Sequence, residues 1–387
     1  MSNTLSILGG LTVEQFLSEY WQKKPLLVRN ALPEIVGMFE PDDIKALALE
    51  EHITARLITQ NGKNHDQWNV KNSPLSSKDF KQLPTYWTLL VQAIDHYSME
   101  LAELWKKFAF IPQWRRDVIM VSYAPKGGSV GQHFDFYDVF LVQGYGQRRW
   151  QLGQFCDENT AFVAYQPLKL LPEMQVNFDE ILHAGDLLYV PPRLAHYGVA
   201  QDECLTFSFG FRMPNQAQII DRISDSFADQ NMTKTPILDI KRSTSQPIGE
   251  IQHAELDDLK QKLLQAIQNH DDFENAVMAL ISEPKYPDHI PELEAINAEE
   301  FQDYCQEGFS IAIEPASRLL YRQLTNQTLA FWANGEQRCL HPSSQMVFKQ
   351  LADGQVMSLN TFNDDDVIQD IIEALNDAVL MLIEPLN

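Results

Sequence analysis

The chain has 387 residues, of which 44% are hydrophobic and 10% aromatic, so it is globular rather than disordered and long enough for two or three domains. Asp and Glu number 53 against 30 Lys and Arg, which gives a formal charge of −23. Such an excess of negative charge repels nucleic-acid backbones and favours a basic protein as the macromolecular partner.

The four cysteines lie far apart and form no CxxC pair, which argues against a zinc knuckle or a disulfide framework. The N-terminus lacks the basic and apolar pattern of a secretory signal. No apolar run reaches the length of about 18 residues that a membrane helix needs. We therefore expect a cytoplasmic protein that does not enter a membrane.

The first hundred residues predict helices with one short strand between them. Thr12 and Gln15 have the spacing of a capping box, so a helix should follow them and end before Pro25. The run that begins at Pro25 is β-like. Apolar residues at intervals of three and four predict two further helices, over 41–52 and 86–108.

The character of the sequence changes at Asp117, where β-rich runs begin. The run 118–123 is followed by further short runs of the same kind, separated by Gly, Pro and Asp, at 139–143, 148–152, 187–190 and 204–212. Many short strands with turn residues between them predict a β-sandwich or barrel.

Beyond Pro214 the apolar residues return to helical spacing. Two helices are predicted, over 217–231 and 255–269, with a Ser-, Thr- and Pro-rich loop between them over 233–247. This helical block is a candidate for self-association, although simple packing on the barrel explains the pattern equally well.

The last hundred residues predict helices and a hairpin. A helix is expected over 298–307, and Asn334-Gly335 joins two β-like runs, which is the strongest short-range signal for a hairpin. This mixture fits a winged-helix-like module. Residues 286–387 hold 17 Asp and Glu against 4 Lys and Arg, a net charge of −13, so we do not expect the module to bind DNA.

Three side chains form a candidate metal site. His133 and Asp135 stand two residues apart in a β-like segment, where alternate residues share a face. His196 follows a tight turn at Gly185 and the strand 187–190. Two imidazoles and one carboxylate leave the opposite positions of an ion open, as in non-haem Fe(II) oxygenases, whereas a structural zinc site is filled by four ligands.

A His-x-Asp pair is weak evidence alone, because the chain contains a second one at His270. That pair stands in a polar, helix-like run over 268–274, where residues two apart point in different directions. We interpret it as a solvated helix surface. His196 alone would fit a hydrogen-bonded core histidine, and only the joint pattern favours a ligand.

Arg148 is the candidate anchor for a cosubstrate carboxylate. Arg148 and Arg149 are adjacent in a predicted strand before Trp150, so they point to opposite faces and only one can reach a cavity. A guanidinium can bind a carboxylate through two parallel hydrogen bonds, although most arginines lie at the surface. Ser122, on the strand before the first motif, is a weaker candidate for a hydroxyl contact.

With these residues the chain resembles the JmjC-type 2-oxoglutarate oxygenases, and more narrowly the bacterial ribosomal oxygenases that hydroxylate an arginine of the sixteenth large-subunit ribosomal protein. The matching stretches are 20–29, 133–150, 185–198 and 208–212. The resemblance implies a mainly β fold, a double-stranded β-helix (cupin or JmjC barrel) with N-terminal helices over 1–213. It further implies a helical dimerisation domain over 214–285 and an acidic winged-helix-like domain over 286–387.

The same resemblance implies the residues of the site and its chemistry. The family's iron ligands fall on His133, Asp135 and His196. Its arginine for the distal carboxylate of 2-oxoglutarate falls on Arg148, so Fe(II), 2-oxoglutarate and O2 are the expected cofactors. The expected enzyme is a homodimer that hydroxylates an arginyl side chain of a basic ribosomal protein. Tyr137 and Asp138, directly after the ligand pair, are candidate substrate contacts.

The barrel motifs leave the substrate open. Related enzymes hydroxylate histidine or demethylate lysine, and these motifs do not separate them from an arginyl hydroxylase. A metal-binding cupin without turnover, acting in ribosome assembly, is the alternative of another class. One departure from the cupin pattern is Arg193, at a position that is often glycine; it affects the turn before His196 and leaves the ligands intact.

Overall fold

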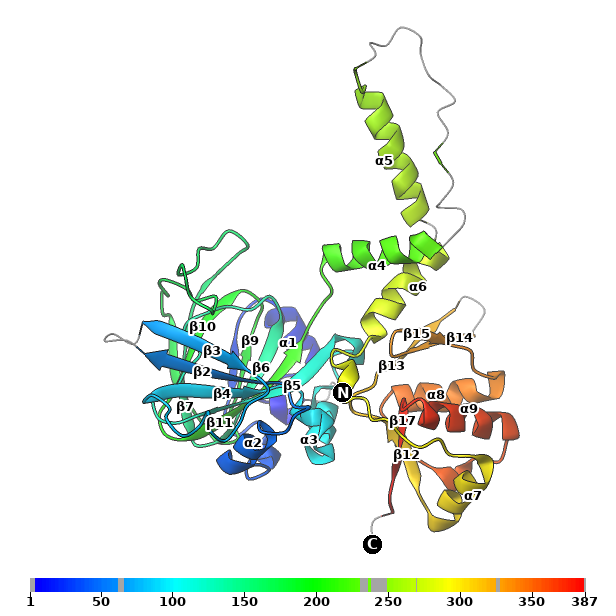
Figure 1. Ribbon diagram of the computed structural model, residues 1–387, viewed down its shortest axis with the longest axis horizontal. Coiled ribbons are helices and arrows are strands. Elements are labelled where there is room, and N and C mark those ends of the chain that lie inside the picture. Colours follow the sequence, from blue (N-terminus) through cyan, green and yellow to red (C-terminus); the bar gives the residue numbers. More distant parts are fainter. Residues whose placement is uncertain are drawn as a thin grey trace. The chain divides into compact units, whose positions relative to one another are not determined.

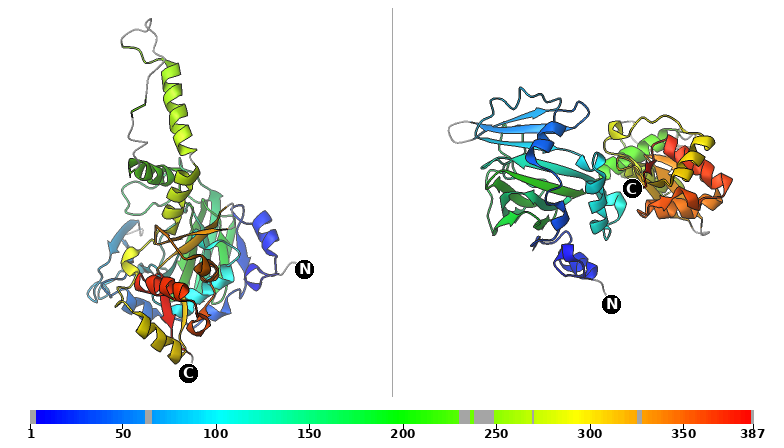
Figure 2. Two further views of the ribbon diagram at one scale, coloured as in Figure 1. Left: turned by 90° about the vertical axis from the view of Figure 1, so that its right-hand side faces the viewer. Right: turned by 90° about the horizontal axis from the view of Figure 1, so that it is seen from below.

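The computed structural model describes residues 4–61, 66–229, 236–237, 249–268, 270–324 and 328–385 of the chain (Figure 1). Contacts divide it into two compact units, Met1–Met213 and Pro214–Asn387. Figure 2 shows the strands of the first unit from two further sides. Among the described residues, no helix combines the length and the hydrophobicity that crossing a membrane requires.

The first unit is built on two sheets. Eight strands form the larger sheet in the order β1-β9-β6-β11-β5-β4-β2-β3, and three form the smaller one in the order β10-β7-β8. Their bounds are β1 Leu26–Val28, β2 Ala55–Asn61, β3 Gln67–Asn72, β4 Tyr86–Val91, β5 Arg116–Ala124, β6 Asp138–Tyr145, β7 Gln147–Phe155, β8 Phe178–His183, β9 Leu187–Val190, β10 Leu194–Ala200 and β11 Cys204–Phe211. All of these pairs are antiparallel, and the predicted β barrel and its five predicted runs are confirmed.

The N-terminal helices are shorter than predicted. Thr12 and Gln15 form the predicted capping box, with each side chain accepting a hydrogen bond from the other's backbone N–H, and helix α1 covers Val13–Glu19. Helix α2 covers Pro41–Leu47, which is the first part of the predicted 41–52 helix.

The predicted helix over 86–108 is wrong in its first part. Strand β4 occupies Tyr86–Val91, and the only α-helix in the segment is α3, Met99–Glu103, followed by a 3-10 helix over Leu104–Phe108. The last four residues of β4 are buried on both faces of the strand, so the apolar residues run on without alternation. A run of this kind has no period that separates a strand from a helix.

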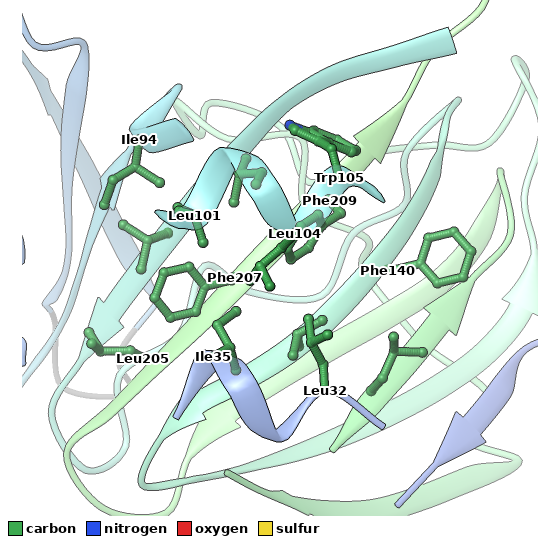
Figure 3. Close-up of a cluster of buried hydrophobic side chains, with 14 of the residues drawn as sticks. Leu32, Ile35, Ile94, Leu101, Leu104, Trp105, Phe140, Leu205, Phe207 and Phe209 are labelled. Carbon is green, nitrogen blue, oxygen red and sulfur yellow. The ribbon is translucent and has the colours of Figure 1, made fainter. Parts of the chain in front are cut away.

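The larger sheet separates a hydrophobic core from an inner face. Along β11, Phe207 and Phe209 pack on Leu101 and Leu104 of the N-terminal helical region, as Figure 3 shows. Residues between them point to the other face because side chains alternate along a strand. Strand β5 follows the same rule: its core-facing positions alternate with positions that face the smaller sheet. A second, smaller core lies between the two sheets.

The second unit combines helices with two three-stranded sheets, ordered β16-β12-β17 and β13-β14-β15. Its helices are α4 Gln216–Asp229, α5 His253–Ile267, α6 His270–Ser282, α7 Ala298–Glu307, α8 Gln345–Ala352 and α9 Asp365–Asn376. Its strands are β12 Ser310–Ile313, β13 Leu319–Gln323, β14 Leu329–Ala333, β15 Glu336–Arg338, β16 Met357–Ser358 and β17 Leu380–Ile383. The predicted 233–247 loop lies almost entirely outside the described residues.

The predicted hairpin is present, with β14 and β15 paired around Asn334 and Gly335. Both turn residues have positive φ, 50° and 90°, which is the backbone that Asn-Gly supplies in a two-residue hairpin turn. The predicted helix over 298–307 coincides with α7. His270 begins helix α6, so the second His-x-Asp pair stands in a helix as predicted.

Candidate metal centre

His133 and His196 meet through an antiparallel backbone bridge. The N–H of His133 donates to the carbonyl of His196 at 3.0 Å, and the reverse bond is 2.8 Å long. The imidazole centroids consequently lie 4.3 Å apart. Asp135 completes the group: its Oδ2 lies 3.9 Å from Nε2 of His133 and 3.7 Å from Nε2 of His196. Within the described parts of the chain, this is the only set of three His, Cys, Asp or Glu residues whose ligand atoms converge, all within 4.8 Å.

The Nδ1 atoms of both imidazoles are already hydrogen-bonded to backbone carbonyl groups. Nδ1 of His133 lies 2.9 Å from the carbonyl oxygen of Gly131, and Nδ1 of His196 lies 2.9 Å from that of Leu194. Since a carbonyl only accepts, each Nδ1 must donate, so Nε2 is the nitrogen of each ring that is available to an ion beside Asp135. Burial lowers the pKa of His196 to about 4, so its ring is neutral at pH 7. Two imidazoles that present Nε2 and a carboxylate fit a divalent transition-metal ion.

The turn before β9 is held by a buried carboxylate. Asp186 accepts hydrogen bonds from the backbone N–H of His183 at 2.9 Å and of Asn30 at 2.8 Å, and from the Arg29 guanidinium at 2.7 Å. Burial alone would raise the pKa of Asp186, but these donors outweigh it and lower the pKa. The turn at Gly185, with φ of 90°, is thereby fixed.

Arg193 ties the two metal-binding segments together. Its φ is 67°, in the left-handed region that favours glycine, which explains why the cupin pattern often has glycine here. Its N–H donates to the backbone carbonyl of Asp135 at 2.6 Å. The loop that carries Asp135 is thus held beside the strand that carries His196.

A cavity of about 290 Å³ lies beside the three side chains, between the two sheets. The larger sheet lines it with alternate residues of β5 and β11, among them Ser122 and Ser208. The smaller sheet contributes Arg148, Trp150 and His196. The cavity therefore combines an apolar lining with a few polar and charged side chains, and it is a suitable place for a small anionic cosubstrate next to an ion.

Arg148 is a buried cation in this cavity. The residue is 2% exposed, its Nη2 lies 3.6 Å from the Cys204 thiol, and its Nε has no hydrogen-bond partner. It forms no ion pair with any residue that the structure describes. Arg149 points outward and pairs with Asp179 at the surface, so the two arginines lie on opposite faces as predicted. Burying a guanidinium without a partner is energetically unfavourable. The far carboxylate of a dicarboxylic ligand would supply that partner.

The structure separates the two expected substrate contacts. Tyr137 lines the cavity, whereas Asp138 is fully buried on the opposite side and is absent from the cavity wall. The Asp138 carboxylate accepts hydrogen bonds from the Tyr189 hydroxyl at 2.6 Å, from Gln22 Nε2 at 2.9 Å and from Arg115 at 3.2 Å. Its contacts thus join the N-terminal segment to β6.

Two residues that the sequence analysis did not single out lie in the same cavity. Arg212 Nε is 2.6 Å from Asp117 Oδ2, and the Arg212 guanidinium carbon lies 4.6 Å from the centre of the Tyr137 ring. The Asp117 side chain is 8% exposed and that of Arg212 49%. Asp117 and Tyr137 thus both contact the guanidinium of Arg212, and this pair of residues is called the guanidinium subsite below.

Known families match two parts of the chain. A JmjC domain matches residues 103–219, and a ROXA-like winged helix matches residues 262–381. The probable ribosomal oxygenase of Haemophilus influenzae is 45% identical over 356 residues, which are 89% of this chain and 87% of that protein. The ribosomal protein uL16 3-hydroxylase of Escherichia coli is 30% identical, over 76% of this chain and 78% of that protein.

Solved structures agree with these matches. The structure of YcfD, a ribosomal oxygenase from Escherichia coli, in complex with cobalt and 2-oxoglutarate has a TM-score of 0.83 and 27% identity, and the alignment covers 96% of this chain and 98% of that one. A YcfD complex with cobalt and succinic acid has a TM-score of 0.82. The likeness therefore extends through both units of the chain.

Proposed function

The chain belongs to the JmjC-type ribosomal oxygenase family, and from this premise we propose that it hydroxylates an arginine side chain of a large-subunit ribosomal protein. It is a 2-oxoglutarate-dependent dioxygenase whose cofactors are Fe(II), 2-oxoglutarate and O2. The alternative of a cupin without turnover is therefore set aside. We further propose that it acts in the cytoplasm, where its ribosomal substrate is made.

We assign the metal to His133, Asp135 and His196, and the distal carboxylate of 2-oxoglutarate to Arg148. The converging ligand atoms and the fixed imidazole tautomers support the first assignment. The buried guanidinium without an ion pair supports the second. When bound, iron with 2-oxoglutarate and O2 supplies the oxidising power to insert one oxygen atom into a C–H bond, with succinate and carbon dioxide as coproducts.

The protein's own residues hold and shield the reactants. The three ligands come from one face, which leaves room for cosubstrate and oxygen on the other. Arg148 fixes the cosubstrate by its far end, and the Trp150 ring beside it contributes to the dry wall of the cavity. The substrate side chain must enter the same cavity past Asp117 and Tyr137.

The guanidinium subsite is the observation that favours arginine over histidine as the target side chain. The Asp117 carboxylate and the Tyr137 ring line the cavity that holds the metal ligands, and they already bind one guanidinium, that of Arg212. An imidazole would make a weaker pair with Asp117, because it lacks the planar fork of donors. The overall charge of −23 agrees with a basic ribosomal protein as partner.

Mass spectrometry tests the proposal directly. Purified protein with Fe(II), 2-oxoglutarate and O2 is expected to add the mass of one oxygen atom to a peptide of ribosomal protein uL16, and fragmentation should place it on an arginine. A matched peptide with lysine in place of that arginine should stay unmodified. Oxygen on a histidine would identify a histidyl hydroxylase, and absence of modification on peptide and intact ribosomes would contradict the proposal.

We propose in addition that residues 214–285 mediate a homodimer. Helix α5 carries a row of leucines that are about half exposed: Leu256, Leu259 and Leu263. A row of this size at helical spacing is typical of a helix that packs on a partner. Sedimentation velocity should give the mass of a dimer for the whole protein and of a monomer for a Leu259→Glu, Leu263→Glu variant; a monomeric wild type would contradict the proposal.

A further inference from the structure

The Arg148 guanidinium is hydrogen-bonded to the thiol of Cys204. Arg148 Nη2 donates to the Cys204 sulfur at 3.6 Å, and this is the only hydrogen bond that the guanidinium forms with the described residues. Arg148 lines the cavity, whereas Cys204 is fully buried and absent from the cavity wall. The thiol therefore contacts the guanidinium on the side that faces away from the cavity.

The position of the Cys204 thiol is fixed by close packing. Cys204 begins β11, where its backbone pairs with Ala124 of β5. The turn before β7 lies directly against it: a Cβ on Gly146 would be 2.1 Å from the Glu203 carbonyl oxygen and 3.0 Å from Cys204 Cβ. The Cys204 side chain packs with Ala124 and Ala200, which are both buried. Neighbours at this density leave the thiol no room to move away from Arg148.

The backbone of Arg148 is fixed as well. Arg148 is paired with Ala200 of β10 on one side and with Leu182 of β8 on the other. Only the torsions of its long side chain can therefore change how far the guanidinium reaches into the cavity. Because the Cys204 thiol lies behind the guanidinium, it blocks the conformations in which the side chain would withdraw from the cavity.

We propose that Cys204 is a positioning residue for Arg148 and thereby determines which length of dicarboxylic 2-oxo acid the enzyme accepts. This inference rests on the proposed assignment of Arg148 to the far carboxylate of the cosubstrate. The oxo-acid end binds at the metal site and the far carboxylate at Arg148, so the separation of these two points selects the chain length. A guanidinium that cannot withdraw leaves no space for a longer chain.

The probe is 2-oxoadipate, which has one methylene more than 2-oxoglutarate. A fitted pocket typically discriminates one methylene by roughly 10- to 200-fold, and we expect the wild type to prefer 2-oxoglutarate by a factor in this range. Cys204→Ala removes the sulfur and opens a space into which the guanidinium can withdraw. It should weaken 2-oxoglutarate binding roughly three- to tenfold, the equivalent of one net hydrogen bond, and should tighten 2-oxoadipate binding.

Calorimetry on the full chain loaded with Mn(II), without O2, measures the dissociation constant of each acid in the absence of turnover. A serine hydroxyl is shorter than a thiol but still accepts a hydrogen bond, so Cys204→Ser should give an intermediate discrimination. This variant also serves if thermal unfolding shows that Cys204→Ala is poorly folded. The matched control is Cys156→Ala, which removes another buried thiol of the same unit, 3.9 Å from the Gln154 carbonyl, and should change neither constant.

A double variant separates positioning from a structural role. In an Arg148→Met background, Cys204→Ala should leave the discrimination between the two acids unchanged, because the guanidinium that the thiol positions is absent. If Cys204→Ala weakens both acids equally, or if its effect on the discrimination persists without Arg148, Cys204 does not act through Arg148 and the inference is overturned.

The outcomes also separate this inference from the proposed function. If Arg148→Met loses affinity for 2-oxoglutarate but the folded Cys204 variants keep the discrimination of the wild type, Arg148 remains the cosubstrate anchor and only the inference fails. If Arg148→Met binds 2-oxoglutarate as tightly as the wild type, the assignment of Arg148 fails and the inference fails with it.

Discussion

Replacing His196 by alanine is expected to abolish substrate hydroxylation and succinate release together. His196 is 3% exposed, and its Nε2 faces Asp135 beside the His133 ring, so alanine removes one of the three converging ligand atoms. Loss of an outer partner of a metal ligand typically costs about 10- to 100-fold in affinity or activity, and loss of a ligand should cost more. Succinate release measures the reaction, and a Co(II) titration followed by visible absorption measures the metal.

His183→Ala is the matched control for this variant. His183 lies on β8, exposed and on the other side of the Gly185 turn. It bonds to Asp186 through its backbone N–H and carbonyl, which alanine retains. The control should keep wild-type metal binding and turnover. An active His196→Ala enzyme, or one that binds Co(II) with wild-type affinity, would show that the metal lies elsewhere.

Replacing Arg148 by methionine is expected to raise the KM for 2-oxoglutarate by at least about 100-fold, because a carboxylate buried without its partner costs about 3–5 kcal/mol. The same change should stabilise the protein when no cosubstrate is bound. Arg148 is 2% exposed and its Nε has no hydrogen-bond partner, so its buried charge lowers the free energy of unfolding when no cosubstrate is bound. Replacing even a paired buried charge by apolar side chains of similar volume is often neutral or stabilising by about 1–4 kcal/mol, so we expect a gain for the unpaired Arg148.

Succinate formation against 2-oxoglutarate concentration measures the KM. Thermal unfolding with and without 2-oxoglutarate measures the stability of the protein and its response to the cosubstrate. Unfolding of the wild type should shift upward with the cosubstrate, and unfolding of Arg148→Met should not. The control is Arg149→Met, which removes the neighbouring surface pair with Asp179 and should leave the KM unchanged. An unchanged KM in Arg148→Met would remove Arg148 from the cosubstrate site.

The elements predicted from sequence were those with a local signal. The Thr12 capping box, the Asn334-Gly335 turn and the alternating strands each depend on residues a few positions apart. Strand β4 was mistaken for a helix because its buried residues show no period. His133 and Asp135 do lie together as predicted, but not in a regular strand: His133 forms an isolated bridge and Asp135 lies in the following loop.

The guanidinium subsite had no local signal. Asp117 and Arg212 are 95 positions apart, and only the antiparallel pairing of β5 with β11, which places Phe211 opposite Arg116, brings them together. For Asp138 a signal was available: adjacent residues near a strand point to opposite faces, so Tyr137 and Asp138 could not both face the cavity. For Asp117 and Arg212, the pairing of distant strands could not be read from the sequence. For Asp138, strand alternation could be read from it but was not applied.

The division of β5 and β11 into core-facing and cavity-facing positions bears on how such an enzyme can evolve. Phe207 and Phe209 maintain the fold, while Ser208 between them faces the reactants. Because neighbouring positions serve different ends, mutation can remodel the cavity without disturbing the packing behind it. One stable scaffold can thus be adapted to a new substrate through a few changes at the cavity-facing positions, while the core-facing positions continue to stabilise the fold.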